Sequence, residues 1–144
     1  MARTRLDWGL ASRYADDPSR SPGLQLWRQF LRWQRSVNSL LAPLRITQSQ
    51  FSILASASWL ATRSDGGEVS QQDIADFAGM ERMMVSQLVR RLERDGWLSR
   101  RPSHHDGRAL SLHVTPKGEA CLARALPLVE AHDAEFFGAE TRTR

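Results

Sequence analysis

Residues 70–96 constrain the fold of this chain more than any other stretch. Ser70-Gln71-Gln72-Asp73 has the pattern of a helix-capping box, and Gly79 suits the end of the short helix that this box begins. A second helix follows at once, from Glu81 to Arg94, and ends at Asp95-Gly96. Two short helices joined by a turn at a glycine predict a helix-turn-helix.

After this unit the period of the sequence changes. Residues 97–101 and 109–114 resemble strands, and the PSHHDGR stretch between them contains the turn pair Asp106-Gly107. Apolar residues alternate with polar ones in the second strand, at Leu110, Leu112 and Val114. Glu68-Val69, just before the capping box, is long enough only for a stub of strand. A β-hairpin after a helix-turn-helix predicts a winged helix.

Further helices flank this winged unit. Thr47-Gln48-Ser49-Gln50 is a capping box for a helix through about Ala61, and Thr115-Pro116 begins a last helix through about Phe137. The helix at 24–41 is apolar over nearly half its circumference, a wider arc than a surface helix needs. It therefore either packs against a second subunit or lies deep in the core.

The length and these elements predict one mainly α (α+β) domain. An N-terminal arm at 1–22, partly helical around 6–14, precedes a single domain at 23–144. Within that domain lie a winged helix-turn-helix at 47–115 and dimerisation helices at 24–42 and 116–137.

Charge and composition suggest an anionic partner inside the cell. The sequence pI is about 10.5, and residues 81–108 carry seven arginines against four acids, a net +3 of the chain's +4. The sequence shows no apolar run long enough for a membrane span and no export signal, and its single cysteine fits a reducing cytoplasm.

Winding residues 81–94 at 100° per residue separates two faces. The apolar face carries Met84, Val85, Leu88, Val89 and Leu92, and the short helix before it is expected to bury Ile74, Ala75 and Phe77. The outward face carries Met83, Ser86, Gln87, Arg90 and Arg94, with Arg82 in the same basic segment. Glutamine and arginine can bind adenine and guanine edges in the major groove, although a solvated helix face is the alternative. Met83 would contact a thymine methyl or pack under the preceding helix.

Three stretches, ITQSQFSIL, VSQQDIADFAGMERMMVSQLVRRLERDGWLSRR and HDGRALSLHVTPKGEA, resemble the MarR-type transcriptional regulators over roughly residues 24–137. The resemblance implies that Arg108 inserts into the minor groove and that Asp106 holds its guanidinium. The alternative for these two side chains is an exposed ion pair of little energetic weight. The resemblance also implies a dimer and a ligand crevice between the dimer layer and the DNA-binding lobe.

Two departures from the family pattern affect these expectations. Met83-Met84 replaces the small hydroxyl residues common at the start of the recognition helix, so target preference should differ. The family usually has a further helix after the long one at 116–137, so we expect a smaller dimer layer. Either the arm at 1–22 compensates for it, or dimerisation is weaker.

The SHHDGR stretch first suggests a metal site or a catalytic pair. Because His104, His105 and Asp106 are consecutive in a turn, their side chains diverge, whereas zinc needs three or four convergent ligands. Neither a metal nor a cofactor is predicted. The histidines are instead expected to donate to the DNA backbone, with higher affinity once they are protonated below pH ~6.5.

The remaining candidates are weaker. Trp27, Phe30, Trp33 and Trp59 could line a crevice for a small aromatic effector, although aromatic residues at helical spacing are more often core. Cys121 is expected to be structural, with an oxidant sensor as the alternative, because a sensor thiol must be accessible and acidic.

The predicted function is therefore a cytoplasmic, sequence-specific repressor and no enzyme. It would act as a homodimer on a pseudo-palindromic operator in double-stranded DNA and be relieved by a small ligand. The alternative is a winged-helix protein-interaction module without specific DNA binding.

Overall fold

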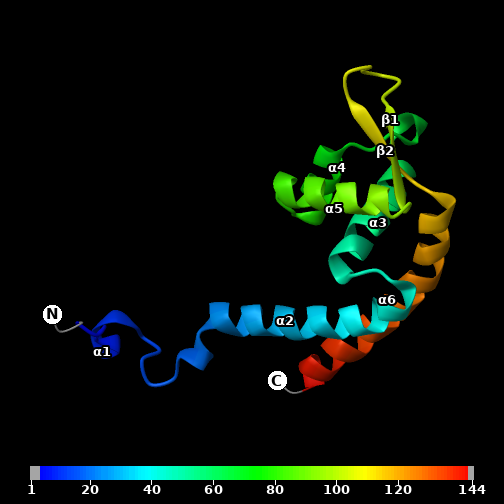
Figure 1. Cartoon of the computed structure of the whole chain (residues 1–144). Coiled ribbons are helices and arrows are strands. Elements are labelled where there is room, and N and C mark those ends of the chain that lie inside the picture. The colour runs from blue at the N-terminus through cyan, green and yellow to red at the C-terminus, as the bar shows by residue number, and fades with distance from the viewer. Residues whose placement is uncertain (1–3, 143–144) are drawn as a thin grey trace. The chain divides into compact units, whose positions relative to one another are not determined.

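The computed structural model of the chain describes residues 4–142, with the side chains of residues 4–138 (Figure 1). Two compact units are distinguished, residues 1–36 and residues 37–144. The helices and strands are α1 (Trp8–Ala11), α2 (Pro22–Leu41), α3 (Gln48–Ala61), α4 (Gln71–Ala78), α5 (Arg82–Arg94), β1 (Leu98–Pro102), β2 (Leu110–Val114) and α6 (Pro116–Arg142). The predicted order of the helices and of the two hairpin strands is confirmed, while the arm contains one turn of α-helix and a 3-10 helix at Pro18–Arg20.

Both predicted capping boxes form. The Thr47 hydroxyl accepts from the Gln50 amide at 3.2 Å, and the Gln50 side chain accepts from the Thr47 amide at 3.0 Å. Ser70 and Asp73 make the same reciprocal pair at 3.0 and 2.9 Å. Gly79 ends α4 in the left-handed region at φ 68°, which glycine adopts without a steric penalty.

Helix α3 is the centre of the winged unit and packs against α4, α5, α6 and β2. The core of the winged unit consists of nine fully buried side chains, namely Ile53, Leu54, Val69, Ile74, Val85, Val89, Leu92, Leu98 and Leu112. At ~25 cal/mol per Å² of buried apolar area, this core is the main stabilising contribution to the lobe that carries the hairpin.

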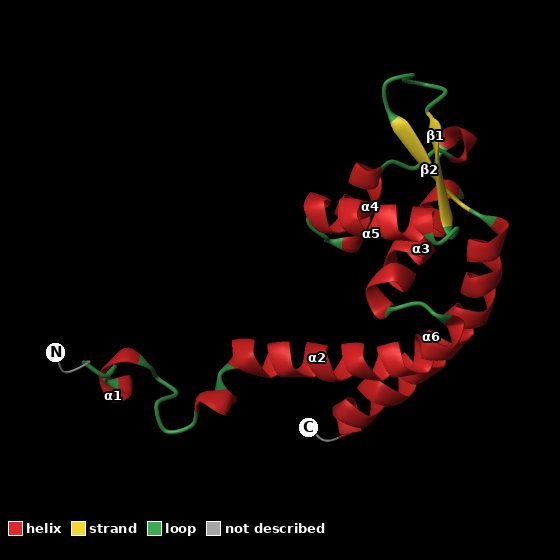
Figure 2. Ribbon diagram, viewed as in Figure 1, coloured by secondary structure: helices red, strands yellow, loops and turns green. Residues whose placement is uncertain are grey.

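The hairpin is antiparallel, from the pair Leu98–Val114 to the pair Pro102–Leu110, and its loop extends beyond the helices (Figure 2). Simple alternation along β2 is wrong as a guide to burial, because Leu110 is exposed and Ser111 is buried. Leu110 lies next to the loop, beyond the packed helices. The segment at 68–69 is not a strand, but the Val69 carbonyl accepts from the Leu112 amide at 2.7 Å.

Two expected core residues lie at the surface. Phe77 is 54% exposed and stacks on Trp59, with ring centroids 5.1 Å apart. Met84 is also exposed, because it lies in the first turn of α5, where α3 and α4 do not cover that side. Helical periodicity gives the direction of a side chain but not how far the neighbouring helices extend.

The start of α6 is joined closely to the start of β1. The Thr115 hydroxyl accepts from the Gly118 amide at 3.2 Å, as expected for an N-cap, and donates to the Gly96 carbonyl at 2.6 Å. A Cβ at Gly118 would lie 2.5 Å from the Trp97 carbonyl oxygen, so the two backbones meet only because this residue is glycine. The helix then runs to Arg142, five residues past the predicted end.

Candidate nucleic-acid interface

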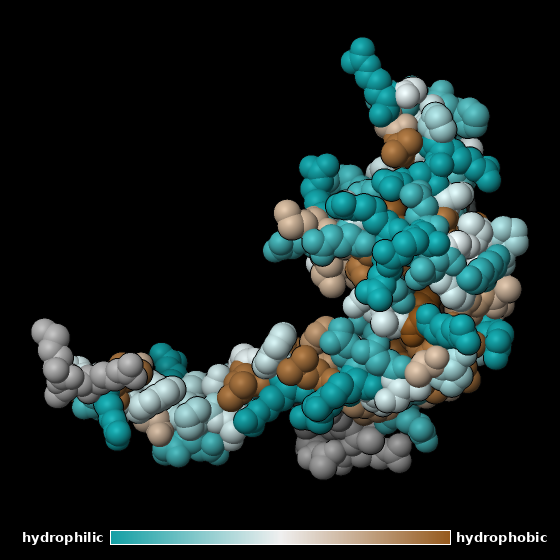
Figure 3. Space-filling model, viewed as in Figure 1, coloured by the Kyte–Doolittle hydropathy of each residue, from teal (hydrophilic) through white to brown (hydrophobic). Residues whose placement is uncertain are grey.

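The outward face of α5 is polar and accessible. Arg82, Gln87, Arg90 and Arg94 are exposed, and Ser86 is half-buried. Met83 is 73% exposed, so the alternative in which it packs under the preceding helix is wrong. The visible face of the winged lobe is largely hydrophilic (Figure 3). This face can offer several hydrogen-bond donors and one methyl-contacting side chain to a groove.

Two residues of the predicted DNA-facing side of α5 bind each other. The Arg90 guanidinium donates to the Ser86 hydroxyl at 3.2 Å and to the Ser86 carbonyl at 3.5 Å, which holds it along the helix. Arginine binds guanine through two parallel donors. A bidentate contact with a base through Nε and Nη2 would therefore require Arg90 to leave Ser86.

The SHHDGR stretch folds into a compact turn organised by Ser103. Its hydroxyl accepts from the amides of His105 and Asp106 at 3.1 and 3.2 Å. The Asp106 carboxylate accepts from the Arg108 amide at 3.0 Å, and the Asp106 carbonyl accepts from the Ala109 amide at 3.0 Å. The turn is thus fixed by side chain–backbone bonds of the kind that serine and aspartate make.

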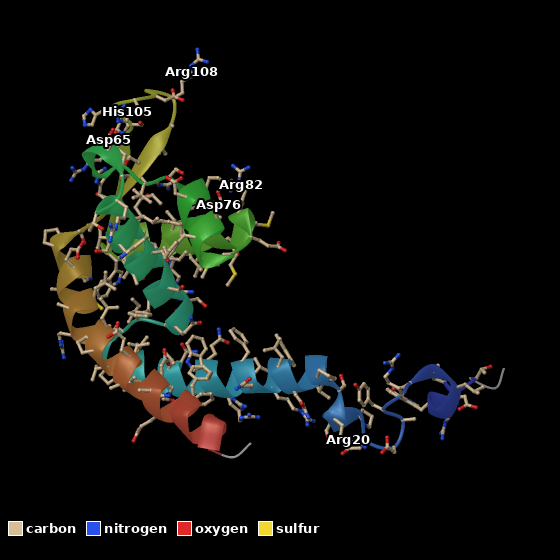
Figure 4. The ribbon with its side chains drawn as sticks, turned by 180° about the vertical axis from the view of Figure 1, so that it is seen from behind. Arg20, Asp65, Asp76, Arg82, His105 and Arg108 are labelled. Atoms are coloured by element: carbon tan, nitrogen blue, oxygen red, sulfur yellow. The ribbon has the colours of Figure 1, made fainter. Side chains whose placement is uncertain are left out.

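Asp106 therefore acts on the backbone of the turn. Its carboxylate forms no ion pair with the Arg108 guanidinium in the described structure. The expectation that Asp106 holds this guanidinium is therefore not met. The Arg108 side chain extends outward from the loop, and Arg82 projects outward from the start of α5 (Figure 4). The wing presents Arg108 by shaping the turn, which leaves its guanidinium to other partners.

Glu68 fastens the wing to the loop before α4, a role that sequence patterns did not reveal. Its carboxylate accepts from the Ser103 hydroxyl at 2.6 Å and from the His104 amide. These two bonds hold the pKa of the Glu68 carboxyl below its ordinary value. Glu68 and Ser103 are 35 residues apart, so no local motif links them.

A second carboxylate links α5 to β1. Glu93 accepts from Arg100 through two bonds, Nε–Oε2 at 2.8 Å and Nη2–Oε1 at 3.0 Å. The Arg100 guanidinium lowers the pKa of the Glu93 carboxyl, mainly by hydrogen bonding. The pair therefore removes one arginine and one acid from the counts for residues 81–108, which leaves six arginines, three acids and the same net charge of +3.

His104 and His105 are exposed on the turn. Among the side chains of residues 4–138, no three from His, Cys, Asp or Glu are grouped so that they could hold a metal ion. The described part of the chain also has no helix both long and apolar enough to cross a membrane.

The predicted effector-binding residues fall in different units. Trp27 stacks on Phe30, with centroids 6.3 Å apart, in residues 1–36. Trp59 stacks on Phe77 in residues 37–144, and Phe77 was not predicted to belong to a site. A crevice that joins Trp27, Phe30 and Trp59 stays a prediction.

Cys121 has neither property that an oxidant sensor needs. It is 6% exposed, and burial raises the pKa of its thiol above the ordinary value. Reactive cysteines are accessible and have a lowered pKa. The structure favours the structural role for this residue.

Comparison with known proteins agrees with the fold and the wing. The sequence model of the MarR family matches residues 46–110. The HTH-type transcriptional regulator YdcH of Bacillus subtilis is 38% identical over 122 residues, which are 85% of this chain and 82% of that protein. The HTH-type transcriptional repressor Mb2911 of Mycobacterium bovis is 30% identical over 80% of this chain and 78% of its own length.

A solved structure agrees as well. The transcriptional repressor CouR, solved with a 23-mer DNA duplex, aligns with a TM-score of 0.69 at 30% identity and covers 97% of this chain and 92% of its own. Its likeness extends over nearly the whole described chain, including the hairpin and α5. Sequence and structure together show that this chain belongs to the MarR family of winged helix-turn-helix transcriptional regulators.

Proposed function

We propose that this chain is a sequence-specific DNA-binding repressor that acts as a homodimer on a pseudo-palindromic operator and is relieved by a small ligand. One observation carries the proposal: α5 exposes Arg82, Gln87, Arg90 and Arg94 beside a hairpin that presents Arg108 outward. Repressor relatives and a DNA-bound structural neighbour support it. We expect it to act in the cytoplasm, without catalysis.

Each exposed side chain has a role suited to its chemistry. Gln87 would pair with an adenine edge and Arg90 with guanine, while Met83 would contact a thymine methyl. Arg108 would enter the minor groove, whose negative potential attracts arginine where the groove is narrow. His104 and His105 would donate to the phosphate backbone from the sides of the same turn.

The dimer is needed for the geometry of recognition. Two copies of α5 can read successive major grooves only if they are about 34 Å apart, one turn of DNA. Helices α2 and α6 would supply the contacts between subunits.

The test begins with selection of bound fragments from genomic or random DNA, followed by titration of the selected operator. Arg90→Ala should weaken binding by ~1–3 kcal/mol and relax preference at one base pair. Arg108→Ala should weaken binding more evenly across sequences, because it contributes charge and shape recognition. Arg124→Ala, at an exposed arginine of α6, is the matched loss of one positive charge and should leave affinity unchanged under conditions where sedimentation shows that this variant is a dimer.

Unchanged operator affinity for both Arg90→Ala and Arg108→Ala contradicts this mode of binding. Salt dependence separates the alternative, a protein-interaction module. Phosphate contacts make log K fall by ~0.9 per phosphate neutralised for each tenfold rise in salt, whereas an apolar protein interface responds little.

A further inference from the structure

Helices α3 and α6 leave an open groove between them, to which α4 contributes Phe77. Its volume is about 620 Å³, within the range of small-molecule sites. Every lining residue lies within residues 37–144, and the groove contains no residue of α5 or of the wing. The groove is therefore separate from the DNA-facing side chains.

Part of the lining of the groove is aromatic. Trp59 from α3 and Phe77 from α4 stack with an interplanar angle of 18°. The Arg63 guanidinium already lies over the Trp59 ring, 5.3 Å from its centroid, so this indole accepts a cation on its face. Both rings are about half exposed and form a wall that an aromatic or alkyl group can cover.

The charged residues that line the groove are all acidic. Glu119 and Glu130 are among its lining residues, and these include no arginine, lysine or histidine. The Ser58 hydroxyl donates to the Glu119 carboxylate, 3.1 Å from each oxygen, and thereby orients it. Among the described residues neither glutamate forms an ion pair. Two carboxylates thus line the groove without an ion-pair partner, while the Arg63 guanidinium lies over the Trp59 ring of the aromatic wall.

The glutamates lie at the two ends of one stripe on α6. Leu122 and Leu126 lie between them, and the stripe spans about three helical turns. A complementary ligand has an apolar body for the leucines and the aromatic wall, and a positive charge for a carboxylate. A carboxylic acid would instead bury its charge beside two like charges without a partner, which is costly.

We propose that this groove binds a lipophilic organic cation. The inference deepens the proposed function, because such a cation would be the small ligand that relieves repression. The role of the cation in repression therefore rests on the proposed function.

The test uses two rigid probes of nearly equal size and opposite charge, tetraphenylphosphonium and tetraphenylborate, with the full chain in equilibrium dialysis. We expect the cation to bind at least about tenfold more tightly than the anion, because each nearby carboxylate attracts one and repels the other. Equal binding of the two probes, or binding of neither because another protein segment covers the groove, overturns the proposal.

Variants locate the site. Glu119→Gln and Glu130→Gln remove one charge each with little change of shape, and each should weaken the cation by about fivefold while strengthening the anion. Glu135→Gln is the matched control, since Glu135 is an exposed glutamate of the same helix outside the groove. Trp59→Leu should weaken cation binding with the charge intact. An equal effect of Glu135→Gln and Glu119→Gln contradicts a localised site.

Operator binding is measured on the same samples, which separates the two proposals. A chain that binds the cation but no DNA contradicts the proposed function and leaves this inference standing. A chain that binds its operator but prefers neither probe contradicts this inference alone.

Discussion

At the scale of single residues, Gly118 has the least room for a side chain among the glycines at positions 9–118. A Cβ there would meet the Trp97 carbonyl oxygen at 2.5 Å and the Val114 side chain at 2.6 Å. The carbonyl belongs to the backbone that leads into β1, so it cannot rotate away as a side chain would. Gly118 thus joins the first turn of α6 to the base of the hairpin.

Gly118→Ala should lower the free energy of unfolding by ~1–3 kcal/mol, as overpacking does elsewhere. Urea unfolding followed by circular dichroism measures the change. Gly107→Ala is the control, because a Cβ there would meet nothing within 4 Å and its backbone is not in the left-handed region. Equal stability of the two variants would show that the contact relaxes without cost.

The contribution of Glu68 to the free energy of unfolding can be isolated by varying the pH. Its pKa is lowered in the folded chain, so its stabilising effect is present above the ordinary carboxyl range and is lost as the pH falls through the folded value. The stability difference between the native chain and Glu68→Gln should therefore be largest at about pH 7 and shrink toward about pH 3. Ser103→Ala removes one of the two bonds and should reduce the same pH dependence. A difference that stays constant with pH contradicts this account.

At the scale of elements, the Glu93–Arg100 pair couples the recognition helix to the wing. Fork-shaped pairing of a guanidinium with a carboxylate fixes direction as well as distance. The wing is thus held on two sides, by α5 through Arg100 and by the loop before α4 through Ser103. Its orientation relative to α5 is set by these bonds and by the Leu98 and Leu112 core contacts.

A double-mutant cycle with Glu93→Gln and Arg100→Gln should show a coupling of ~0.5–1 kcal/mol in unfolding free energy, since the pair is partly exposed and screened. Arg94 and Asp95 form the control pair, because they are 3.9 Å apart and well exposed. Their coupling should not be measurable. The account is wrong if the two pairs couple equally.

Helix ends and turns were predictable from the sequence where neighbouring residues determine them. Both capping boxes, the glycine that ends α4 and the hairpin follow from residues within a few positions of one another. Contacts between distant residues were not predictable, including the Glu68 bonds and the stacking of Phe77 on Trp59. Side-chain direction along α5 was also predictable, but the exposure of Met84 depends on where α3 and α4 end.

At the scale of the whole molecule, α2 carries apolar side chains at the surface of the chain. Leu26 is 67% exposed and Trp27 is 57% exposed, and hydrophobic atoms are visible along this helix (Figure 3). Large exposed apolar groups close together mark interaction surfaces. Their number favours the subunit-contact alternative for α2 over the buried-core alternative, and the homodimer stays a prediction.

Sedimentation at micromolar concentration should therefore show a dimer. Leu26→Glu together with Trp27→Glu should shift the chain toward monomer, because charge burial in an apolar interface is unfavourable. Leu110→Glu, at an exposed leucine of the hairpin, is the control and should leave the dimer intact. A native chain that sediments as a monomer contradicts the dimer.

The buried thiol of Cys121 can be used to detect local unfolding of the chain. Because this is the chain's single cysteine, a thiol reagent has one target, and that target is shielded while the fold persists. The labelling rate would thus follow the population of opened molecules. A cysteine introduced at an exposed position such as Gly107 could carry a fluorophore on the wing, with the native thiol left in place.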